Sequence, residues 1–322
     1  MNTKQKMLLI LNPVAGMGKA KDKLPLIQEL LNKNDLNYET VLTEYPRHAT
    51  ELAKAAASFD IVIAAGGDGT VNEVASGLMQ LKNEGKTPPA LAVLCVGRGN
   101  DFAYGADVPP GLAEGIDVIA AGIKRPMDMG FVKGGDYPEG KYFANGIGAG
   151  FDTIVGLEAA KMKFLRGAMA YVAGAIKTLY LFPDAPVATI NSDGAIIEQP
   201  VQQISIMNGK RMGGSFFMAP QAENHDGFFD LCIAERLNRR EMLNLVVLFT
   251  KGTQAGHPKI KTRKGAKISI VAPNGGLIVH ADGETVCIDG NRLDIECLPA
   301  ALEMVCDPGR VSRLKAREKK GI

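Results

Sequence analysis

The sequence predicts a two-domain α/β protein in which a parallel α/β domain precedes an antiparallel β-sandwich domain. The chain has 322 residues, more than a single hydrophobic core usually serves. Its first third alternates short apolar runs with segments of helical period, and this β-α repeat is typical of a parallel sheet covered on both faces. From Asp128 onward, short segments of alternating polarity separated by turn residues indicate an antiparallel sandwich or barrel.

In the first domain, apolar runs ended by glycine, proline or polar residues predict the strands. These strands are Met7–Asn12, Tyr38–Leu42, Asp60–Ala65 and Ala90–Val96. Helices are predicted after Gly18, with an apolar face over residues 24–31, and over Ala49–Ser58 and Thr70–Leu81. Ligands of such a domain bind at the carboxyl ends of its parallel strands.

In the second domain, turn signals separate many short strands. The predicted strands are Tyr142–Ile147, Pro186–Asn191, Val201–Asn208, Phe228–Ile233, Lys267–Val271, Leu277–His280, Thr285–Ile288 and Arg292–Leu298. Two helical stretches, near Phe151–Leu181 and Arg239–Lys251, interrupt them. The boundary between the domains is predicted near residue 128.

The composition excludes several classes of protein. A net charge of +2 is too low for a dedicated nucleic-acid-binding protein, and no stretch approaches the about 20 apolar residues that span a bilayer. The apolar run Met7–Leu11 is too short for a signal peptide. Five cysteines without a Cys-x-x-Cys pair make a disulfide framework or a zinc site unexpected and favour a cytoplasmic protein.

Three glycine-bearing loops follow three of the parallel strands. Gly66-Gly67-Asp68-Gly69-Thr70 lies between a buried strand and a helix, where glycines allow close approach or positive φ and helix amides attract phosphate. The other two are Asn12-Pro13-Val14-Ala15-Gly16 and Gly97-Arg98-Gly99-Asn100-Asp101-Phe102. Together they predict a phosphate-binding edge, although the loop at 66–70 alone could be a tight turn capped by Thr70.

Two acidic turns stand out in the second domain. His280-Ala281-Asp282-Gly283-Glu284 lies between two strands, and Asn224-His225-Asp226-Gly227-Phe228 precedes another. Asp-Gly is a common hairpin turn, and this structural interpretation stays open for both. The functional one is that an acid at the tip of the first turn accepts a proton from a substrate.

With these motifs in place, the chain resembles the bacterial diacylglycerol kinase family of soluble lipid kinases from Met7 to Asp307. The motifs that carry the resemblance are Gly66–Thr70, Gly97–Phe102, Asp128-Met129-Gly130, Phe143–Phe151, Asp226-Gly227 and Asp282-Gly283-Glu284. The resemblance implies a nucleotide-binding α/β domain (1–127), a β-sandwich lipid-kinase domain (128–300), and an active cleft between them. The segment 301–322 is expected to return to the first domain and to end in a basic tail.

The resemblance also implies roles for individual residues. Nucleotide contacts fall on Asn12, Pro13, Val14, Ala15, Gly16, Thr43, Gly66, Gly67, Asp68, Gly69, Thr70, Val71, Asn72, Glu73, Arg98, Asn100 and Asp101. The catalytic base falls on Glu284, with Asp282, Asp68 and Asp128 as the other acids of the active site. A structural magnesium ion is implied at the side chain of Asp226 and the backbone carbonyls of Glu223 and Phe228.

Arg98 departs from the family pattern, which has threonine at this nucleotide-contacting position. A guanidinium can grip phosphate through two hydrogen bonds, so nucleotide binding is expected to persist or shift. Gln221 stands where an acid is common, which matters little if Asp226 and backbone carbonyls hold the metal.

These features predict an ATP- and Mg²⁺-dependent kinase that phosphorylates the hydroxyl of a lipid, most simply diacylglycerol, while peripherally attached to a membrane. The alternatives are a kinase of a soluble acceptor such as NAD, or a non-catalytic lipid-binding regulator. A homodimer is left open. The apolar residues of 161–182 form either core or a lipid contact, and the basic tail over 309–322 is either a solvated end or a contact to anionic lipid.

Overall fold

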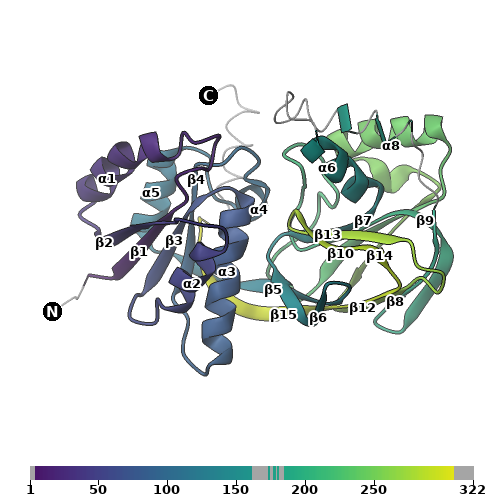
Figure 1. Cartoon of the computed structure of the whole chain (residues 1–322). Coiled ribbons are helices and arrows are strands. Elements are labelled where there is room, and N and C mark those ends of the chain that lie inside the picture. The colour runs from purple at the N-terminus through teal and green to yellow at the C-terminus, as the bar shows by residue number, and fades with distance from the viewer. Residues whose placement is uncertain (1–3, 162–172, 175–176, 179, 181–184, 308–322) are drawn as a thin grey trace. The chain divides into compact units, whose positions relative to one another are not determined.

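The computed structural model describes residues 4–161, 173, 174, 177, 178, 180 and 185–307 (Figure 1). The chain divides into two units. Unit 1 comprises the residues up to Met127 and those from Ala300 on, and unit 2 is Asp128–Pro299. The chain leaves unit 1 within β5 (Lys124–Gly134) and returns within β15 (Arg292–Val305). Most of the apolar stretch 161–182 and the basic tail 309–322 lie outside the described residues.

Unit 1 is a parallel α/β unit, as the alternation of apolar and amphipathic segments predicts. Its strands are β1 (Lys6–Leu11), β2 (Asn37–Leu42), β3 (Ile61–Gly66) and β4 (Ala90–Cys95). They lie in the order β2-β1-β3-β4, and every pair is parallel. The last residues of β15 extend this sheet, since Met304 pairs in parallel with Leu91 of β4.

Helices cover both faces of this sheet. They are η1 (Lys21–Lys23), α1 (Leu24–Lys33), α2 (His48–Lys54), α3 (Asp68–Asn83), α4 (Asp101–Gly105) and α5 (Leu112–Ala121). Ile27 and Leu31 of α1 and Ile116 of α5 share one buried cluster with alternate residues of the strands. The intervening strand residues, such as Ile10 and Val62, are also fully buried, because the opposite face is covered too.

One predicted helix of unit 1 is shorter than expected. The alanine-rich segment Ala49–Ser58 forms a helix only to Lys54, and Ala55 is its C-cap. Residues 56–60 turn into β3 instead. The N–H of Phe59 donates to the carbonyl of Ala56 at 3.1 Å, and the Asp60 carboxylate accepts the N–H of Lys6 at 2.7 Å. The contact of Asp60 with β1 holds the end of this segment in the connection to β3.

Unit 2 is antiparallel throughout the strand pairs described, as predicted. Its strands are β5, β6 (Tyr137–Phe143), β7 (Gly146–Gly150), β8 (Val187–Ser192), β9 (Ala195–Met207), β10 (Phe229–Glu235), β11 (Ile260–Gly265), β12 (Lys267–Val271), β13 (Leu277–Ala281), β14 (Glu284–Gly290) and most of β15. Its helices are α6 (Phe151–Lys161), α8 (Arg239–Lys251) and η2 (Gln254–Gly256).

The long strand β9 joins two sheets around one core. Its first half pairs with β8 and its second half with β7 and β10. Ile190 of one sheet and Ile206 of the other lie in the same buried cluster, which also holds Phe143 stacked on Phe229 with 5.4 Å between ring centroids. This is the packing expected of a β-sandwich.

Three strand assignments in unit 2 need correction, and the first is that β5 (Lys124–Gly134) was not predicted. The predicted strand Tyr142–Ile147 is two strands, because the chain bends between the end of β6 at Phe143 and the start of β7 at Gly146. The strand β11 was not predicted, since Lys261, Arg263 and Lys264 mask its polarity pattern. Within the described residues, no helix is long and apolar enough to cross a membrane.

Candidate active site

The glycine loop of unit 1 joins β3 to α3. Gly66 ends the strand, and Gly67 precedes the helix with φ −96° and ψ −171°. A Cβ on Gly66 would lie 2.3 Å from the Cβ and Oγ1 atoms of Thr70. Neither glycine has a positive φ, so of the two reasons for glycine that the sequence offers, positive φ does not apply here. The loop needs glycine because other atoms approach closely.

The loop after β4 packs directly on this glycine loop. The N–H of Gly97 donates to the carbonyl of Gly66 at 2.9 Å. A Cβ on Gly97 would lie 2.3 Å from the Cα of Gly67, a distance that real structures do not tolerate. The two loops therefore lie backbone against backbone, and glycine at 97 makes this possible.

The loop after β1 joins the same edge through Asn12. Its Nδ2 donates to the Thr70 hydroxyl at 3.0 Å, and its Oδ1 accepts the N–H of Val14 at 3.1 Å. Gly16 has φ +60°, and a Cβ there would lie 2.6 Å from the carbonyl oxygen of Val96. Thr43 follows β2 and donates its N–H to Leu11 at 2.9 Å. The structure thus brings together the loops that were predicted to share one edge.

The N-terminus of α3 opens onto this edge. No side chain of the described residues caps it, so Thr70 is not a cap and its hydroxyl is bonded to Asn12 instead. Uncapped amides of a first helical turn attract anions. Gly69 is exposed and a Cβ there would meet nothing within 4 Å, whereas the side chains of Val71 and Asn72 are buried and that of Glu73 is half-buried.

Asp68 connects the glycine loop with α4. Its Oδ1 accepts the N–H of Phe102 at 2.9 Å. Asn100 has φ +49°, and Asp101 is a buried residue at the start of α4. Arg98 is exposed, and its guanidinium has no ion-pair partner among the described residues. An ion pair between Arg98 and Asp101 is therefore absent from the part of the chain that the structure describes.

In unit 2, Asp282 anchors the turn between β13 and β14. Its carboxylate accepts the backbone N–H groups of Ala144 at 2.6 Å, Asn145 at 3.1 Å and Gly146 at 2.8 Å. These three bonds bend the chain between β6 and β7, which explains why the predicted strand over 142–147 is divided. Asp282 itself has φ +48° and Gly283 has φ +83°, so the turn geometry depends on this glycine.

Glu284 lies at the start of β14, two residues after Asp282. Its Oε2 forms an ion pair with the Nζ of Lys141 from β6. The Lys141 side chain is 10% exposed and that of Glu284 39% exposed, so the carboxylate is accessible while its partner is held in the protein. Lys141 was missed as a site residue, because nothing near it in the sequence indicates a contact with residue 284.

Two further side chains support this turn and were also missed. The Nδ1 of His280 accepts the N–H of Gly283 at 3.2 Å, and its Nε2 lies 3.9 Å from the Oδ2 of Asp152 in α6. Gly148 of β7 makes room for them, since a Cβ there would lie 2.2 Å from Asp152 Oδ2 and 2.5 Å from His280 Nε2. Burial raises the pKa of Asp152 to about 7 and lowers the pKa of His280 to about 4, so His280 is neutral at pH 7.

These two shifts predict a pH dependence of stability. Asp152 in the folded protein keeps a proton that the unfolded chain loses above pH 3.8. Its contribution to the free energy of unfolding therefore falls as pH rises towards 7. His280 contributes in the opposite sense, because the unfolded chain gains a proton below pH 6.5 that the folded protein takes up only near pH 4. The two effects nearly cancel in the wild type between pH 4 and 6.5.

Asp152→Asn should expose the contribution of His280. Urea denaturation is expected to show the variant losing about 2–3 kcal/mol between pH 6.5 and 4.5, from a shift of about two units at 1.36 kcal/mol each. The wild type should change much less over that range. His280→Gln should show the opposite slope, with stability falling as pH rises. Parallel slopes in all three proteins would contradict the two shifts.

Asp128 begins unit 2 and holds the second acidic turn. It is 1% exposed, its Oδ2 accepts the N–H of Gly227 at 2.7 Å, and its own N–H donates to the carbonyl of Asn224 at 2.8 Å. Asn208 donates from Nδ2 to the carbonyl of Asp128 at 2.9 Å. Asp128 therefore fixes this turn from inside unit 2.

The expected structural magnesium site does not fit the residues present. One oxygen of Asp226 accepts the N–H of Phe228 at 3.0 Å, and the other pairs with the Nζ of Lys264. Its hydrogen bond to Asp226 raises the pKa of Lys264, so this cation persists at neutral pH. An ammonium thus stands where the divalent ion was expected.

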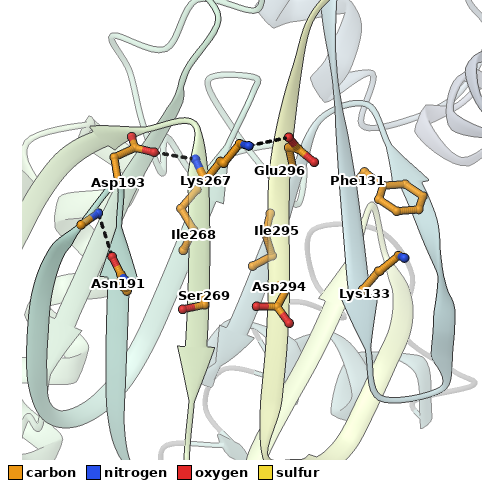
Figure 2. A pocket seen from close by; sticks show the side chains of 11 residues that line it. Phe131, Lys133, Asn191, Asp193, Lys267, Ile268, Ser269, Asp294, Ile295 and Glu296 are labelled. Carbon is orange, nitrogen blue, oxygen red and sulfur yellow. Dashed lines mark hydrogen bonds and ion pairs between the residues drawn. The ribbon is translucent and has the colours of Figure 1, made fainter.

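A separate groove of about 600 Å³ is lined by residues of β5, β8, β12 and β15 and of the turn after β8 (Figure 2). Lys267 and Glu296 form an ion pair at 3.4 Å across it, and the Asp193 carboxylate accepts the N–H of Lys267 at 2.8 Å. Phe131 and Lys133 from β5 lie at its other side. None of the predicted site residues lines this groove, so it is not the candidate active site.

Comparison with known proteins matches both units. A model of the diacylglycerol kinase catalytic domain matches residues 6–132, and a model of the YegS C-terminal NAD kinase beta sandwich-like domain matches residues 145–306. A diacylglycerol kinase of Bacillus subtilis is 29% identical over 84% of this chain and 90% of its own length. One of Staphylococcus aureus is 31% identical over 86% of this chain and 85% of its own length.

Solved structures share the fold. A diacylglycerol kinase from Bacillus anthracis matches with a TM-score of 0.72 at 23% identity, over 96% of this chain and 99% of that one. An NAD kinase from Archaeoglobus fulgidus in complex with ATP matches with a TM-score of 0.54 at 14% identity, over 98% of each chain. Since the family models and the relatives together account for most of its length, the chain belongs to the diacylglycerol kinase family of lipid kinases.

Proposed function

We propose that this lipid kinase transfers the γ-phosphate of ATP to the hydroxyl of diacylglycerol or a related lipid alcohol at a membrane surface. The observation that carries the proposal is the edge of unit 1 where three polar loops meet the uncapped N-terminus of α3. Backbone amides without side-chain caps, on glycines that admit close approach, are suited to a polyphosphate. The name of the Bacillus subtilis and Staphylococcus aureus relatives supports diacylglycerol as the acceptor.

The nucleotide would be held by this edge. The loop from Asn12 to Gly16, Thr43, the segment Gly66–Glu73, and Asn100 and Asp101 are the proposed contacts. Val71, Asn72 and Asp101 are buried, so they would act through their backbone or by supporting neighbouring residues. The exposed backbone at Gly69 and the amides of the first turn of α3 are the groups that would meet phosphate directly.

Magnesium bound with the nucleotide would neutralise charge on the phosphates as the γ-phosphoryl group moves. Asp68 is the carboxylate of unit 1 that would face this ion, because one of its oxygens is bound to Phe102 and the other has no hydrogen-bond donor among the described residues. Asp282, whose carboxylate accepts three backbone N–H groups, would position its turn rather than hold a metal.

Glu284 would act as the base. The lipid oxygen attacks the γ-phosphorus, the bond from that phosphorus to the β-γ bridging oxygen breaks, and ADP leaves. Glu284 accepts the proton of the lipid hydroxyl, and Lys141 orients the carboxylate through the ion pair between them. A base placed in this way is typically worth about 10²–10⁴-fold in rate.

The direct test is ATP consumption by the purified chain with mixed micelles of detergent and diacylglycerol, in parallel with NAD as a soluble acceptor. Phosphatidic acid formed from diacylglycerol would support the proposal. Turnover with NAD alone would favour a second candidate function, a kinase of NAD. The observation behind this candidate is that the chain shares its fold with an NAD kinase. ATP binding without turnover on any acceptor would favour a lipid-binding regulator.

Arg98→Thr is expected to raise the KM for ATP about 10- to 100-fold while changing kcat little. An exposed guanidinium at the nucleotide edge, with no ion-pair partner among the described residues, can donate to phosphate, and one charged hydrogen bond is worth about 1.5–3 kcal/mol. Loss of a contact made equally in the ground and transition states has this kinetic signature. Steady-state ATP titrations measure it, with Lys33→Thr at the end of α1 as the charge-matched control. An unchanged KM would place Arg98 away from the nucleotide, and a large gain in kcat would mean that it suppresses transfer.

A further inference from the structure

The ammonium of Lys264 lies between two carboxylates of unit 2. Lys264 is on β11, directly opposite Asp230 of β10 in the antiparallel register. Its Nζ forms an ion pair with Asp226 and lies 3.7 Å from the Oδ2 of Asp230. The Asp230 side chain is 4% exposed and that of Asp226 is 22% exposed. Both carboxylates are therefore largely shielded from water, and Lys264 is the cation beside them.

The remaining oxygen of each acid is bonded to an uncharged donor. Asp226 Oδ1 accepts the N–H of Phe228 at 3.0 Å, and Asp230 Oδ1 accepts the Nε2 of Gln221 at 3.0 Å. The residue at 221 is thus a donor and supports the same cluster. The two neutral donors and the Lys264 ammonium serve three of the four carboxylate oxygens, and the fourth, the buried Oδ2 of Asp230, has no hydrogen-bond partner, with Lys264 Nζ at 3.7 Å as the neighbouring positive charge.

The cluster supports a turn that reaches the start of unit 2. Gly227, next to Asp226, donates its N–H to Asp128, and Asp128 donates back to the carbonyl of Asn224. Lys264 therefore joins β11 to the segment 221–228, and through it to a proposed residue of the active site.

We propose that Lys264 takes the place of a divalent cation at Asp226, so that this turn is held by a charge that belongs to the chain. Magnesium needs about six oxygen ligands at 2.0–2.1 Å in octahedral order. An ammonium on the same carboxylate oxygen would repel it at short range. Magnesium dependence of the kinase would then come from the nucleotide alone, and the turn would stay folded when free metal is removed.

The test uses the full chain without nucleotide. Hydrogen exchange of a peptide spanning residues 221–230 reports on the amides of Gly227 and Phe228, and the Tm reports on the whole fold. In the wild type, both are expected to be the same in EDTA as in excess MgCl₂. Lys264→Met should speed exchange in this peptide and lower Tm by at least about 3 °C, and added Mg²⁺ or Ca²⁺ should reverse part of both changes, because the acids are then open to a metal.

Lys267→Met is the matched control. It removes the same charge from β12, the next strand in the chain, which pairs with β8 and β15 and not with β11. Lys267 pairs at 3.4 Å with an exposed glutamate, and exchange over 221–230 should not change. Protection of this peptide by Mg²⁺ in the wild type, abolished by Asp226→Asn, would overturn the proposal in favour of a metal site. Equal exchange in the Lys264→Met and Lys267→Met proteins would overturn it as well, since Lys264 would then be an ordinary surface lysine. These outcomes do not depend on which lipid the enzyme phosphorylates.

Discussion

Glu284→Gln is expected to lower kcat at least about 100-fold while leaving ATP affinity and the fold intact. Glutamine keeps the length of the side chain and an oxygen that can accept the Lys141 ammonium, but it is not a base. Only the proton acceptor is lost, and a positioned base typically contributes about 10²–10⁴-fold. The ion pair involves a carboxylate that is 39% exposed, so its weakening should cost little stability.

Three measurements separate this chemistry from a structural effect. Turnover with saturating ATP and lipid gives kcat, calorimetric titration gives the Kd for ATP, and thermal unfolding gives Tm. Glu139→Gln, which changes an exposed glutamate of β6 in the same unit, is the control and should be indistinguishable from wild type in all three. Turnover of folded Glu284→Gln within a few-fold of wild type would remove Glu284 from the mechanism.

Gly67→Val is expected to abolish ATP binding. Gly67→Ala and Gly97→Ala distinguish blocked phosphate approach from a disturbed fold as the cause. Valine at 67 would project a branched side chain at the N-terminus of α3 and block the approach of phosphate. Gly67→Ala has room in the fold, since its Cβ would lie 3.5 Å from Gly97 Cα and the φ of −96° suits any residue. It should keep Tm near the wild-type value while still weakening ATP binding.

Gly97→Ala should instead lower both Tm and ATP affinity. Its Cβ would lie 2.3 Å from the Cα of Gly67, so one loop must move away from the other. Gly69→Ala is the control for fold, since its Cβ would meet nothing within 4 Å. Calorimetric titration with ATP and thermal unfolding of the four variants are the measurements. Wild-type affinity in Gly67→Val would disprove the assignment of this loop to phosphate.

The elements of unit 1 were predictable because their determinants are close together in the sequence. A fully buried run such as Ile61–Gly66 followed by glycines and an amphipathic segment specifies a strand, a turn and a helix without reference to the rest of the chain. Since parallel strands end at one edge of their sheet, the loops at 12–16, 66–70 and 97–102 were expected to meet there. The contacts of Asn12 with Thr70 and of Gly97 with Gly66 confirm that meeting.

Some features of the structure depend on contacts between residues that are far apart in the sequence, and these could not be predicted from local patterns. The segment 142–147 has the composition of one strand, but Asp282, 138 residues after Ala144, takes the amides that would continue it. The family resemblance implied a metal ion at Asp226, and the structure pairs this carboxylate with Lys264, 38 residues away. Glycine at 67 does not use the positive φ that this residue allows, since its φ is −96° and a Cβ there would lie 3.5 Å from the Cα of Gly97.

The sequence by itself determined the two-domain class, the strand-to-helix loops of unit 1 and the acidic turn that carries Glu284, because periodicity and turn chemistry act over a few neighbouring residues. Only the tertiary structure decided which titratable side chains meet: Lys141 with Glu284, Lys264 with Asp226, and His280 beside Asp152. Such pairs depend on strand register, which is fixed by the packing of a whole core. A shift of one residue in β11 or β13 would turn these side chains to the opposite face of the sheet.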